Sequence, residues 1–242
     1  MKIEVFFTPA EAATVDLEGR VAVVIDTLRA TSTIVEALAN GARGVLPAPS
    51  LEEAIRVAQN IGRSEVLLCG ERRSLRVDGF DLGNSPLEFT EDRVGGRSLV
   101  MTTTNGTPAI VAGSAARRVL IASFLNLSAA AEAVASDGGP VAVVCAGRER
   151  RFALEDAICA GALIRRVAAA AGLDEGGGDW NDAARLAAEY ARGMEGSLET
   201  VLRGTAAGRQ LIEAGLEADI AYCATLDRHR IVPELRDHQI TL

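Results

Sequence analysis

The chain has very few of the basic side chains on which several common catalytic systems depend. Lys2 is the only lysine among 242 residues, so neither Schiff-base chemistry nor a phosphate-loop lysine has a candidate in the body of the chain. Histidine occurs only at His229 and His238, which argues against histidine-dependent triads and phosphohistidine chemistry. Almost every basic residue is therefore an arginine.

Other absences limit where the protein works and what it binds. No apolar stretch approaches the roughly 20 residues that cross a bilayer, and the amino terminus lacks the layout of a signal peptide, so we expect a cytoplasmic protein with no membrane partner. The net charge of −8 argues against a nucleic-acid partner. The four cysteines form no Cys-x-x-Cys pair, which disfavours a zinc knuckle or a disulfide framework. We expect Cys69 and Cys145 to be buried thiols.

What the chain does contain is a series of short apolar runs. Apolar residues make up 48% of the sequence and charged residues 24%, which is typical of a globular protein. The runs do not alternate with polar residues, and this favours strands that are buried on both faces of a sheet. Such strands are predicted at Val21–Asp26, Gly44–Pro47, Val66–Gly70, Ser98–Thr103, Val119–Ser123 and Val141–Cys145.

Helical patterns separate these strands and dominate the second half of the chain. A capping box at Ser50 opens a helix that runs to about Ile61, and further helices are predicted at Thr33–Asn40, Pro108–Ala116, Ser128–Ala135, Leu154–Gly172, Trp180–Arg192, Ser197–Arg203 and Ala206–Ala214. The alternation predicts an α/β fold, a three-layer sandwich with a mostly parallel sheet. We divide the chain into a main phosphate-binding domain, 1–172, and a helical carboxyl-terminal lobe, 173–242, that packs back on the sheet. In that lobe, Ile220–Cys223 and Ile231–Pro233 are interpreted as short strands or extended pieces.

Polar residues follow directly where the first of the predicted strands ends. Asp26, Arg29, Thr31 and Thr33 lie between that strand and a helix, and the arrangement recurs at 101–108, where Thr103, Thr104, Asn105 and Gly106 precede a second helix. The carboxyl ends of strands in open α/β sheets are the usual place for ligands, and a helix amino terminus favours anions. The two junctions indicate a site for a phosphate-like anion.

Further carboxylates are expected at the same edge of the sheet. Glu71 and Arg72 follow the third predicted strand, Asp81 lies in the loop between the third and the fourth, and Glu155 and Asp156 begin a helix after the last. Simpler interpretations stay open: Asp26 as a helix cap, Thr102–Thr104 as ordinary strand residues, Asn105-Gly106 as a turn, and Glu155 and Asp156 as partners of a helix dipole.

Together, these carboxylates and arginines suit metal-assisted phosphoryl transfer. Mg²⁺ prefers oxygen ligands and commonly combines one or two carboxylates with a substrate phosphate, while arginine binds phosphate or sulfonate through two parallel hydrogen bonds. The motifs of competing enzyme classes are absent: the chain has no phosphate loop, no Gly-x-Gly-x-x-Gly after its first predicted strand and no Gly-x-Ser-x-Gly elbow. A haloacid-dehalogenase-type phosphatase would carry a second aspartate where this chain has Leu28.

Several segments, in order, resemble the 2-phosphosulfolactate phosphatase family over about residues 3–233. They are Asp26–Ile34, Gly70–Arg72, Gly79–Pro86, Thr102–Thr107, Ser123–Asn126, and Cys145–Gly147 followed by Glu155-Asp156. The resemblance implies a family-specific α/β fold, an oligomer with a dimer as one option, and a Mg²⁺-dependent hydrolase. Its substrate would be the small anionic phosphate ester 2-phosphosulfolactate, split to 3-sulfolactate and phosphate as in coenzyme M biosynthesis. The chain departs from the family pattern at Arg148–Phe152, where a further glycine is expected, and this basic loop could alter substrate choice.

From these observations we assign candidate roles. Asp26, Arg29, Glu71 and Arg72 are predicted to be catalytic; Asp26, Asp81 and Asp156 to bind Mg²⁺; and Thr31, Thr33, Asn84, Ser85, Thr103, Thr104, Asn105 and Gly106 to bind substrate. Asp26 is either a nucleophile or only a metal ligand. Three alternatives stay open: a phosphatase or phosphotransferase for another small phosphorylated hydroxy acid, a lyase acting on a related sulfonate, and a non-catalytic anion-binding protein.

Overall fold

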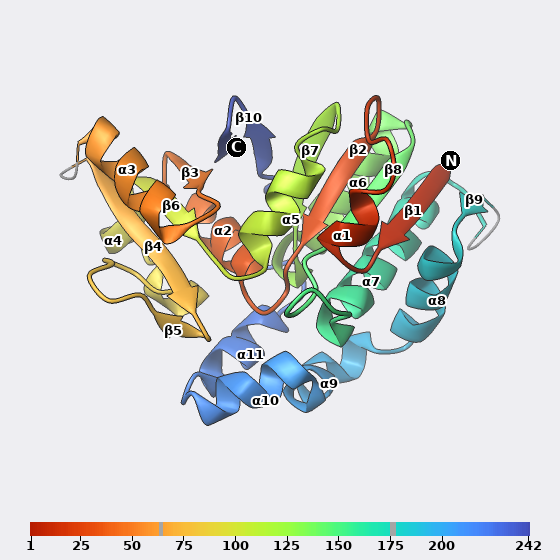
Figure 1. The fold of residues 1–242 in the computed structure, drawn as a ribbon. Helices are drawn as coiled ribbons and strands as arrows, with labels where there is room; N and C mark the ends of the chain where they lie inside the picture. Colours follow the sequence, from red (N-terminus) through yellow and green to blue (C-terminus); the bar gives the residue numbers. More distant parts are fainter. Residues whose placement is uncertain (63–64, 175–177) are drawn as a thin grey trace.

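All strands of the computed structural model, which describes residues 1–62, 65–174 and 178–242, belong to one sheet. Their order across it is β5 (Leu75–Arg76), β4 (Val66–Arg72), β6 (Ser98–Thr102), β3 (Gly44–Pro47), β11 (Gln239–Thr241), β10 (Glu234–Arg236), β7 (Arg118–Ala122), β2 (Val21–Ile25), β8 (Val141–Cys145), β1 (Lys2–Phe6) and β9 (Asp179–Trp180). Helices pack on this sheet (Figure 1), and the predicted α/β class is confirmed.

The sheet consists of two parallel blocks that a carboxyl-terminal hairpin joins. Strands β4, β6 and β3 pair in parallel, and so do β7, β2, β8, β1 and β9. Between the blocks lies the antiparallel hairpin β10–β11, with β10 paired to β7 and β11 paired to β3. The sequence analysis predicted the parallel pairing but not this hairpin.

Most of the helices occupy the predicted stretches with small shifts at their ends, whereas those at 9–12, 91–94 and 217–223 were not predicted. The helices are α1 (Pro9–Ala12), α2 (Ala30–Ala39), α3 (Leu51–Ile61), α4 (Glu91–Val94), α5 (Gly106–Gly113), α6 (Leu127–Asp137), α7 (Leu154–Ala170), α8 (Asp182–Ala191), α9 (Leu198–Gly204), α10 (Ala206–Glu213) and α11 (Glu217–Cys223), with 3₁₀ turns η1 (Pro86–Glu88), η2 (Phe124–Asn126) and η3 (Glu195–Ser197). At the start of α3 the Ser50 hydroxyl accepts a hydrogen bond from the Glu53 amide at 3.1 Å, as the capping box predicts. The interpretation of Ile220–Cys223 as a strand or extended piece is wrong, because these residues form the last turns of α11.

Strand β2 shows why the unalternating apolar runs form the centre of the sheet. Val21, Val23 and Ile25 belong to the core that includes α6 and α7, while Ala22 and Val24 belong to the core that includes α2 and α5. All five side chains are completely buried. Because successive side chains point to opposite faces, an apolar residue is needed at every position. The four cysteines, Cys69, Cys145, Cys159 and Cys223, are buried thiols.

The carboxyl-terminal helices lie beneath the ends of the strands. Figure 1 shows α9, α10 and α11 as a blue layer below the arrowheads of β4 and β2. The predicted domain boundary at 172/173 lies close to residues 175–177, which are outside the described residues. The division at 172/173 stays a prediction.

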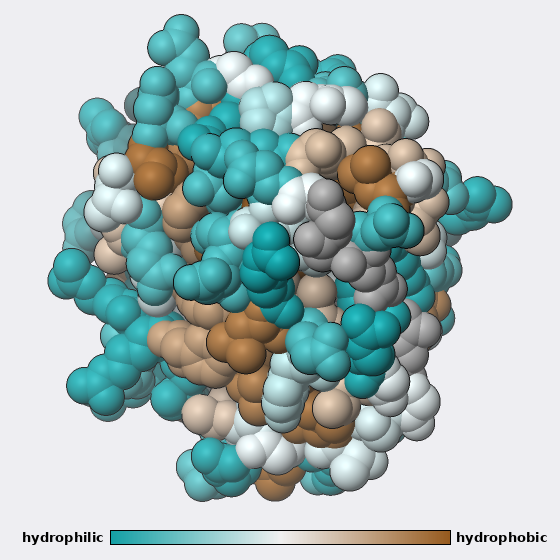
Figure 2. Space-filling model, turned by 90° about the vertical axis from the view of Figure 1, so that its right-hand side faces the viewer, coloured by the Kyte–Doolittle hydropathy of each residue, from teal (hydrophilic) through white to brown (hydrophobic). Residues whose placement is uncertain are grey.

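The outer surface combines hydrophilic side chains with exposed apolar ones. None of the helices in the described ranges is both long and apolar enough to cross a bilayer. Figure 2 shows the face that carries α8, where hydrophobic residues form separate patches between hydrophilic ones. Leu186 and Tyr190 of α8 are among the exposed large apolar residues of the protein, at 61% and 44% exposure.

Candidate active site

A cavity of about 370 Å³ lies where the carboxyl ends of β2, β4, β6 and β8 meet the helices α7 and α10. This volume is suited to a small-molecule ligand. The two parallel blocks of the sheet both contribute to its wall, as the sequence predicted for strand ends. Eight of the predicted site residues line it: Asp26, Arg29, Glu71, Arg72, Asn84, Thr104, Asn105 and Asp156.

Asp26 follows β2 directly and is held in place by its neighbours. Its backbone amide donates to the Thr31 hydroxyl at 3.0 Å, and that hydroxyl donates to the Asp26 carbonyl at 2.9 Å. Its carboxylate lies against the backbone of Gly106, because a Cβ added there would be 2.7 Å from the Asp26 Oδ2 atom and 2.4 Å from the Cβ of Ala30. A glycine at 106 therefore allows the start of α5 to approach the junction between β2 and α2 closely.

Burial raises the pKa of Asp26 to about 7, and the negative charge of Glu71 adds to this effect. The backbone amide of Ala30 and the charge of Arg29 act in the opposite direction, while Glu155 raises the pKa further. A carboxyl group with this pKa changes its charge near neutral pH, which is a property of catalytic acids and bases.

Glu71 and Asp156 line the cavity and also hold its walls together. The two oxygens of Glu71 accept hydrogen bonds from the amides of Thr104, at 2.8 Å, and Ser74, at 2.9 Å. The two oxygens of Asp156 accept from the amides of Thr27, at 2.8 Å, and Gly147, at 3.0 Å. Each carboxylate thereby connects loops that follow different strands. Burial raises the pKa of Asp156 well above its usual value, and the charges of Asp26 and Glu155 raise it further.

Glu155 belongs to the same acidic group, although it was left out of the predicted site. It is buried at the start of α7 and lines the cavity. Burial raises its pKa, and its own backbone amide, the Thr205 hydroxyl and the charge of Arg148 counteract part of that effect. In the sequence, Glu155 and Asp156 form a pair at the start of a predicted helix, and an interaction with the helix dipole was an equal alternative to metal binding for both residues.

Arg29 is buried in an ion pair that the sequence analysis did not detect. Its Nη1 atom lies 2.6 Å from the Asp219 Oδ2 atom, and both side chains are only 2% exposed. The Ser85 hydroxyl donates to the other oxygen of Asp219 at 2.6 Å, and Arg29 Nη2 donates to the Ser74 carbonyl at 2.7 Å. Asp219 lies on α11, which the sequence interpretation did not treat as a helix, so no strand-end pattern pointed to it.

Arg72 directs its guanidinium group toward the protein as well as lining the cavity. Its Nη1 atom donates to the carbonyls of Glu71 and Thr102, at 2.6 and 3.4 Å, and its Nη2 atom donates to the Thr102 hydroxyl at 3.2 Å. These contacts fix the position of the side chain beside the ends of β4 and β6.

Asn84 and the residues at the start of α5 complete the predicted part of the wall. The side-chain oxygen of Asn84 is buried and has no hydrogen-bond partner among the residues that the structure describes. Thr104 and Asn105 immediately precede α5, and the Asn105 side-chain oxygen accepts a hydrogen bond from the Glu149 amide at 3.2 Å. Both residues therefore lie at the positive end of the α5 dipole.

The other predicted residues lie behind the wall. Thr33 donates its hydroxyl hydrogen to the Asn84 carbonyl at 2.8 Å, and Thr103 accepts from the Thr107 amide at 3.1 Å. Asp81 is not among the residues that line the cavity, and its Oδ2 atom accepts from the Leu68 amide at 2.8 Å. Thr31, Thr33, Ser85 and Thr103 thus support the residues that line the cavity, and the structure does not bring Asp81 together with Asp26 and Asp156.

Part of the wall comes from residues that no strand-end argument could identify. Arg73 and Ser74 form the turn between β4 and β5, Arg148 lies in the loop after β8, and Gln210 comes from α10. Of these segments, the sequence analysis singled out only the loop that contains Arg148, because residues 148–151 are rich in arginine.

The donors at the base of the cavity fit Mg²⁺ in kind. Asp26, Glu71, Glu155 and the predicted ligand Asp156 supply carboxylate oxygens, and the amide oxygen of Asn84 is a further neutral donor. In the part of the chain that the structure describes, no three histidine, cysteine or acidic residues form a ready-made metal cage. Mg²⁺ usually binds one or two carboxylates and completes its shell with water and substrate phosphate, so a partial set of ligands is suited to it.

Comparison with known proteins gives a consistent result over nearly the whole chain. Residues 6–238 match the model of the 2-phosphosulpholactate phosphatase family. A probable 2-phosphosulfolactate phosphatase of Symbiobacterium thermophilum is 44% identical over 234 residues, which is 97% of each chain. Proteins with the same name from Thermotoga petrophila and Clostridium acetobutylicum are 42% identical over 219 residues, 90% of each chain, and 37% identical over 240 residues, 99% of this chain and 100% of the relative. The chain belongs to this family, as the sequence motifs predicted.

Proposed function

We propose that this member of the 2-phosphosulpholactate phosphatase family is a Mg²⁺-dependent phosphomonoester hydrolase that converts 2-phosphosulfolactate to 3-sulfolactate and phosphate. The observation that carries the proposal is the buried Asp26 carboxyl group, with its raised pKa, in a cavity that combines carboxylates and arginines. The names of the relatives support the same reaction, and coenzyme M biosynthesis is the context in which we place it.

Asp26 is positioned before any substrate arrives. The Thr31 hydroxyl forms hydrogen bonds with the backbone amide and carbonyl of Asp26, and the Asp26 carboxylate lies against the backbone of Gly106. Such fixed geometry removes orientational freedom that would otherwise be lost at the transition state. With a pKa of about 7, the carboxyl group can hold or release a proton at neutral pH. A nucleophile and a metal ligand both require the ionised form in this same position.

The phosphate group of the substrate is best accommodated between Asp26 and the amino end of α5. Thr104 and Asn105 line this part of the cavity, and the helix dipole there favours an anion. Mg²⁺ would be held by Asp26 and Asp156, with Glu71, Glu155 and the Asn84 oxygen as further candidate ligands. When bound, it would neutralise charge on the phosphoryl group. The arginines of the wall would contact the remaining acid groups of the substrate.

The test is phosphate release from racemic 2-phosphosulfolactate, with Mg²⁺ and with a chelator, beside 2-phospholactate and an aryl phosphate. We expect release that requires Mg²⁺ and favours the sulfonated ester. Calorimetric titration of Mg²⁺ into the metal-free protein and into Asp26→Asn tests the metal site without turnover, and the variant is expected to bind more weakly.

Other outcomes would replace the proposal. Release from 2-phospholactate or the aryl ester alone would keep a hydrolase with another substrate. Transfer of phosphate to an added acceptor, without free phosphate, would indicate a phosphotransferase. Binding of the ester without any turnover would indicate an anion-binding protein, and equal Mg²⁺ affinity in Asp26→Asn would remove Asp26 from the metal site.

A further inference from the structure

The charges of the cavity are divided between its base and its rim. The carboxylates that line its base, Asp26, Glu71, Glu155 and Asp156, are buried together with Arg29. The basic side chains of two hairpin turns are partly or fully exposed and form its rim. Arg72 and Arg73 belong to the β4–β5 hairpin, and Arg148 belongs to the loop between β8 and α7. A substrate with several anionic groups cannot place all of them against the acidic base, so the groups that are not hydrolysed need cationic partners elsewhere on the wall.

Arg148 differs from the other arginines in its hydrogen-bond partner. Arg29 is paired with a buried carboxylate, and Arg72 donates to two carbonyls and a hydroxyl. Arg73 is exposed on the tip of its turn. The Arg148 Nη2 atom donates to the neutral side-chain oxygen of Gln210 at 2.5 Å, and its ionic contact with Glu149 is 3.9 Å long, with Glu149 73% exposed. The hydrogen-bond partner that holds Arg148 in place is thus neutral, and the acidic side chains that its charge acts on are the exposed Glu149 and the buried Glu155.

The backbone around Arg148 is fixed as firmly as the side chain. Arg148 and Arg151 exchange two backbone hydrogen bonds of 2.9 Å across a two-residue turn. The turn residues, Glu149 and Arg150, have φ angles of 51° and 64°, the combination found in type I′ hairpins. The Glu149 amide also donates to Asn105, which lines the cavity. A guanidinium group held in this way loses little conformational freedom when it binds an anion.

We propose that Arg148, oriented by Gln210, determines substrate specificity by binding the sulfonate group of the ester, an inference that rests on the proposed function. In 2-phosphosulfolactate, the sulfur lies one bond farther from the phosphorylated carbon than the carboxylate carbon does. With the phosphate beside Asp26, the sulfonate is therefore the acid group with the longer reach toward the rim. A guanidinium fork matches two oxygens of a sulfonate.

The test compares two esters in the wild-type protein and in Arg148→Gln. 2-Phospholactate has a methyl group where 2-phosphosulfolactate has the sulfonated methylene, so only one ester can use Arg148 in this way. We expect kcat/KM for the sulfonated ester to fall about 10- to 100-fold, mainly through KM, as losing charged hydrogen bonds implies. For 2-phospholactate we expect a loss of about threefold or less. Arg148→Lys keeps the positive charge but not the two parallel donors of the guanidinium group. Its kcat/KM for the sulfonated ester should lie between those of the wild-type protein and Arg148→Gln.

Two further variants separate binding from a structural role. Arg151→Gln removes the same charge from the same turn at an exposed position outside the cavity wall, and the preference for the sulfonated ester should not change. Gln210→Glu places a carboxylate beside Arg148 and should reduce that preference in the same direction as Arg148→Gln. Melting temperatures of all four variants identify any that are misfolded.

The inference would be overturned if Arg148→Gln lowered kcat/KM for both esters by the same factor, or for neither. A second measurement does not depend on turnover: calorimetric binding of 3-sulfolactate and of lactate to the metal-free protein. We expect Arg148→Gln to weaken 3-sulfolactate binding at least about tenfold, while equal affinity in both proteins would contradict the role. If the wild-type protein released no phosphate from either ester, the proposed function would fail, and this binding comparison would still decide the role of Arg148.

Discussion

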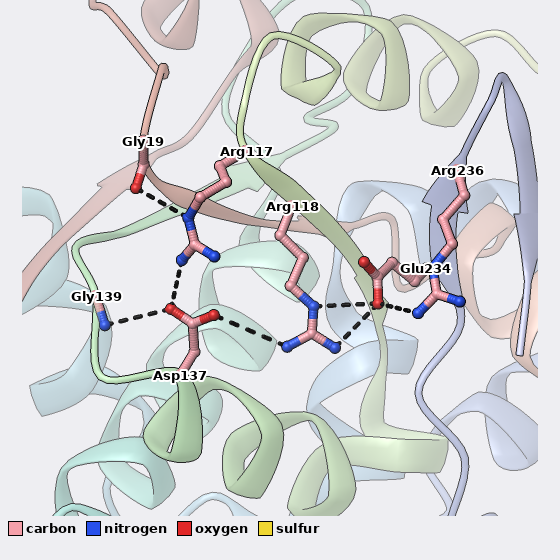
Figure 3. A network of polar contacts seen from close by, with 7 residues as sticks. All are labelled: Gly19, Arg117, Arg118, Asp137, Gly139, Glu234 and Arg236. Carbon is pink, nitrogen blue, oxygen red and sulfur yellow. Dashed lines mark hydrogen bonds and ion pairs between the residues drawn. The ribbon is translucent and has the colours of Figure 1, made fainter.

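The two ends of the parallel strands surround their acidic side chains in opposite ways. At the amino ends, shown in Figure 3, acids and arginines alternate: Arg117 donates to Asp137 at 2.6 Å, and Glu234 accepts from Arg118 and Arg236 at 3.0 Å each. At the carboxyl ends, carboxylates gather around Asp26. The same kinds of side chain are thus paired at one end and crowded together at the other.

The pKa values reflect this difference. Burial raises the pKa of Glu234, but hydrogen bonds from Arg118 and Arg236 outweigh it, and the net result is a lowered pKa. For Asp26 and Glu155 the net result is the reverse. Paired charges at the amino ends therefore contribute to stability, whereas the crowded carboxylates cost stability unless a proton or a cation is bound. Such a cost is typical of sites whose residues are placed for function.

The sharpest test of the comparison is Asp26→Asn. We expect activity to fall at least about a thousandfold, because a carboxylate needed at the reacting centre is lost, while the metal-free fold becomes more stable. The folded pKa of Asp26, about 7, lies above its usual 3.8, so its contribution to stability is complete at low pH and is lost as the pH rises through 7. The stability gained by the variant should thus grow by about 2 kcal/mol between about pH 5.5 and pH 8.

Chemical unfolding of both proteins at the two pH values, with a chelator present, measures this gain. If Asp26→Asn were less stable than the wild-type protein at both values and kept normal turnover, Asp26 would be a helix cap and the comparison between the two ends would fail.

Local pattern was sufficient to predict the central strands of the parallel blocks and eight of the residues that line the cavity. Val21–Ile25 needed apolar residues at every position because both faces are covered, and Asp26 was found because it directly follows that strand. The hairpin β10–β11 could not be predicted, because each strand has only three residues and its pairing with β7 and β3 depends on tertiary contacts. Asp219 escaped detection for a related reason: it meets Arg29 across 190 positions of the chain, and no local spacing records such a contact.

Asp219 is the exception at the carboxyl ends of the strands. Its carboxylate is paired with an arginine, Arg29, as the acidic residues at the amino ends are. Asp219→Ala leaves the Arg29 charge buried without its partner, and we expect the free energy of unfolding to fall by about 3–5 kcal/mol. Activity should fall as well, because Arg29 loses the contact that orients it at the cavity. Denaturant unfolding and phosphate release measure the two effects.

The matched control for Asp219 lies on the same helix. Glu217 forms an exposed ion pair with Arg203 at 3.2 Å, so Glu217→Ala should cost less than about 1 kcal/mol and leave turnover unchanged. If Asp219→Ala and Glu217→Ala lowered the free energy of unfolding equally, the buried Arg29–Asp219 pair would be no more important for stability than an exposed one.

The smallest effect is expected at the amino ends, from Glu234→Gln. Because the folded pKa of Glu234 is lowered, its ion pairs stabilise the fold above the unfolded pKa, and this contribution is lost as the pH falls through the folded value. We expect the variant to be less stable by about 1 kcal/mol near pH 7, with the difference shrinking in acid and in high salt. Its activity should equal that of the wild-type protein, because Glu234 lies at the end of the sheet opposite the cavity. A difference that grew on acidification, or a loss of turnover, would mean that the two ends of the sheet are not electrostatically separate.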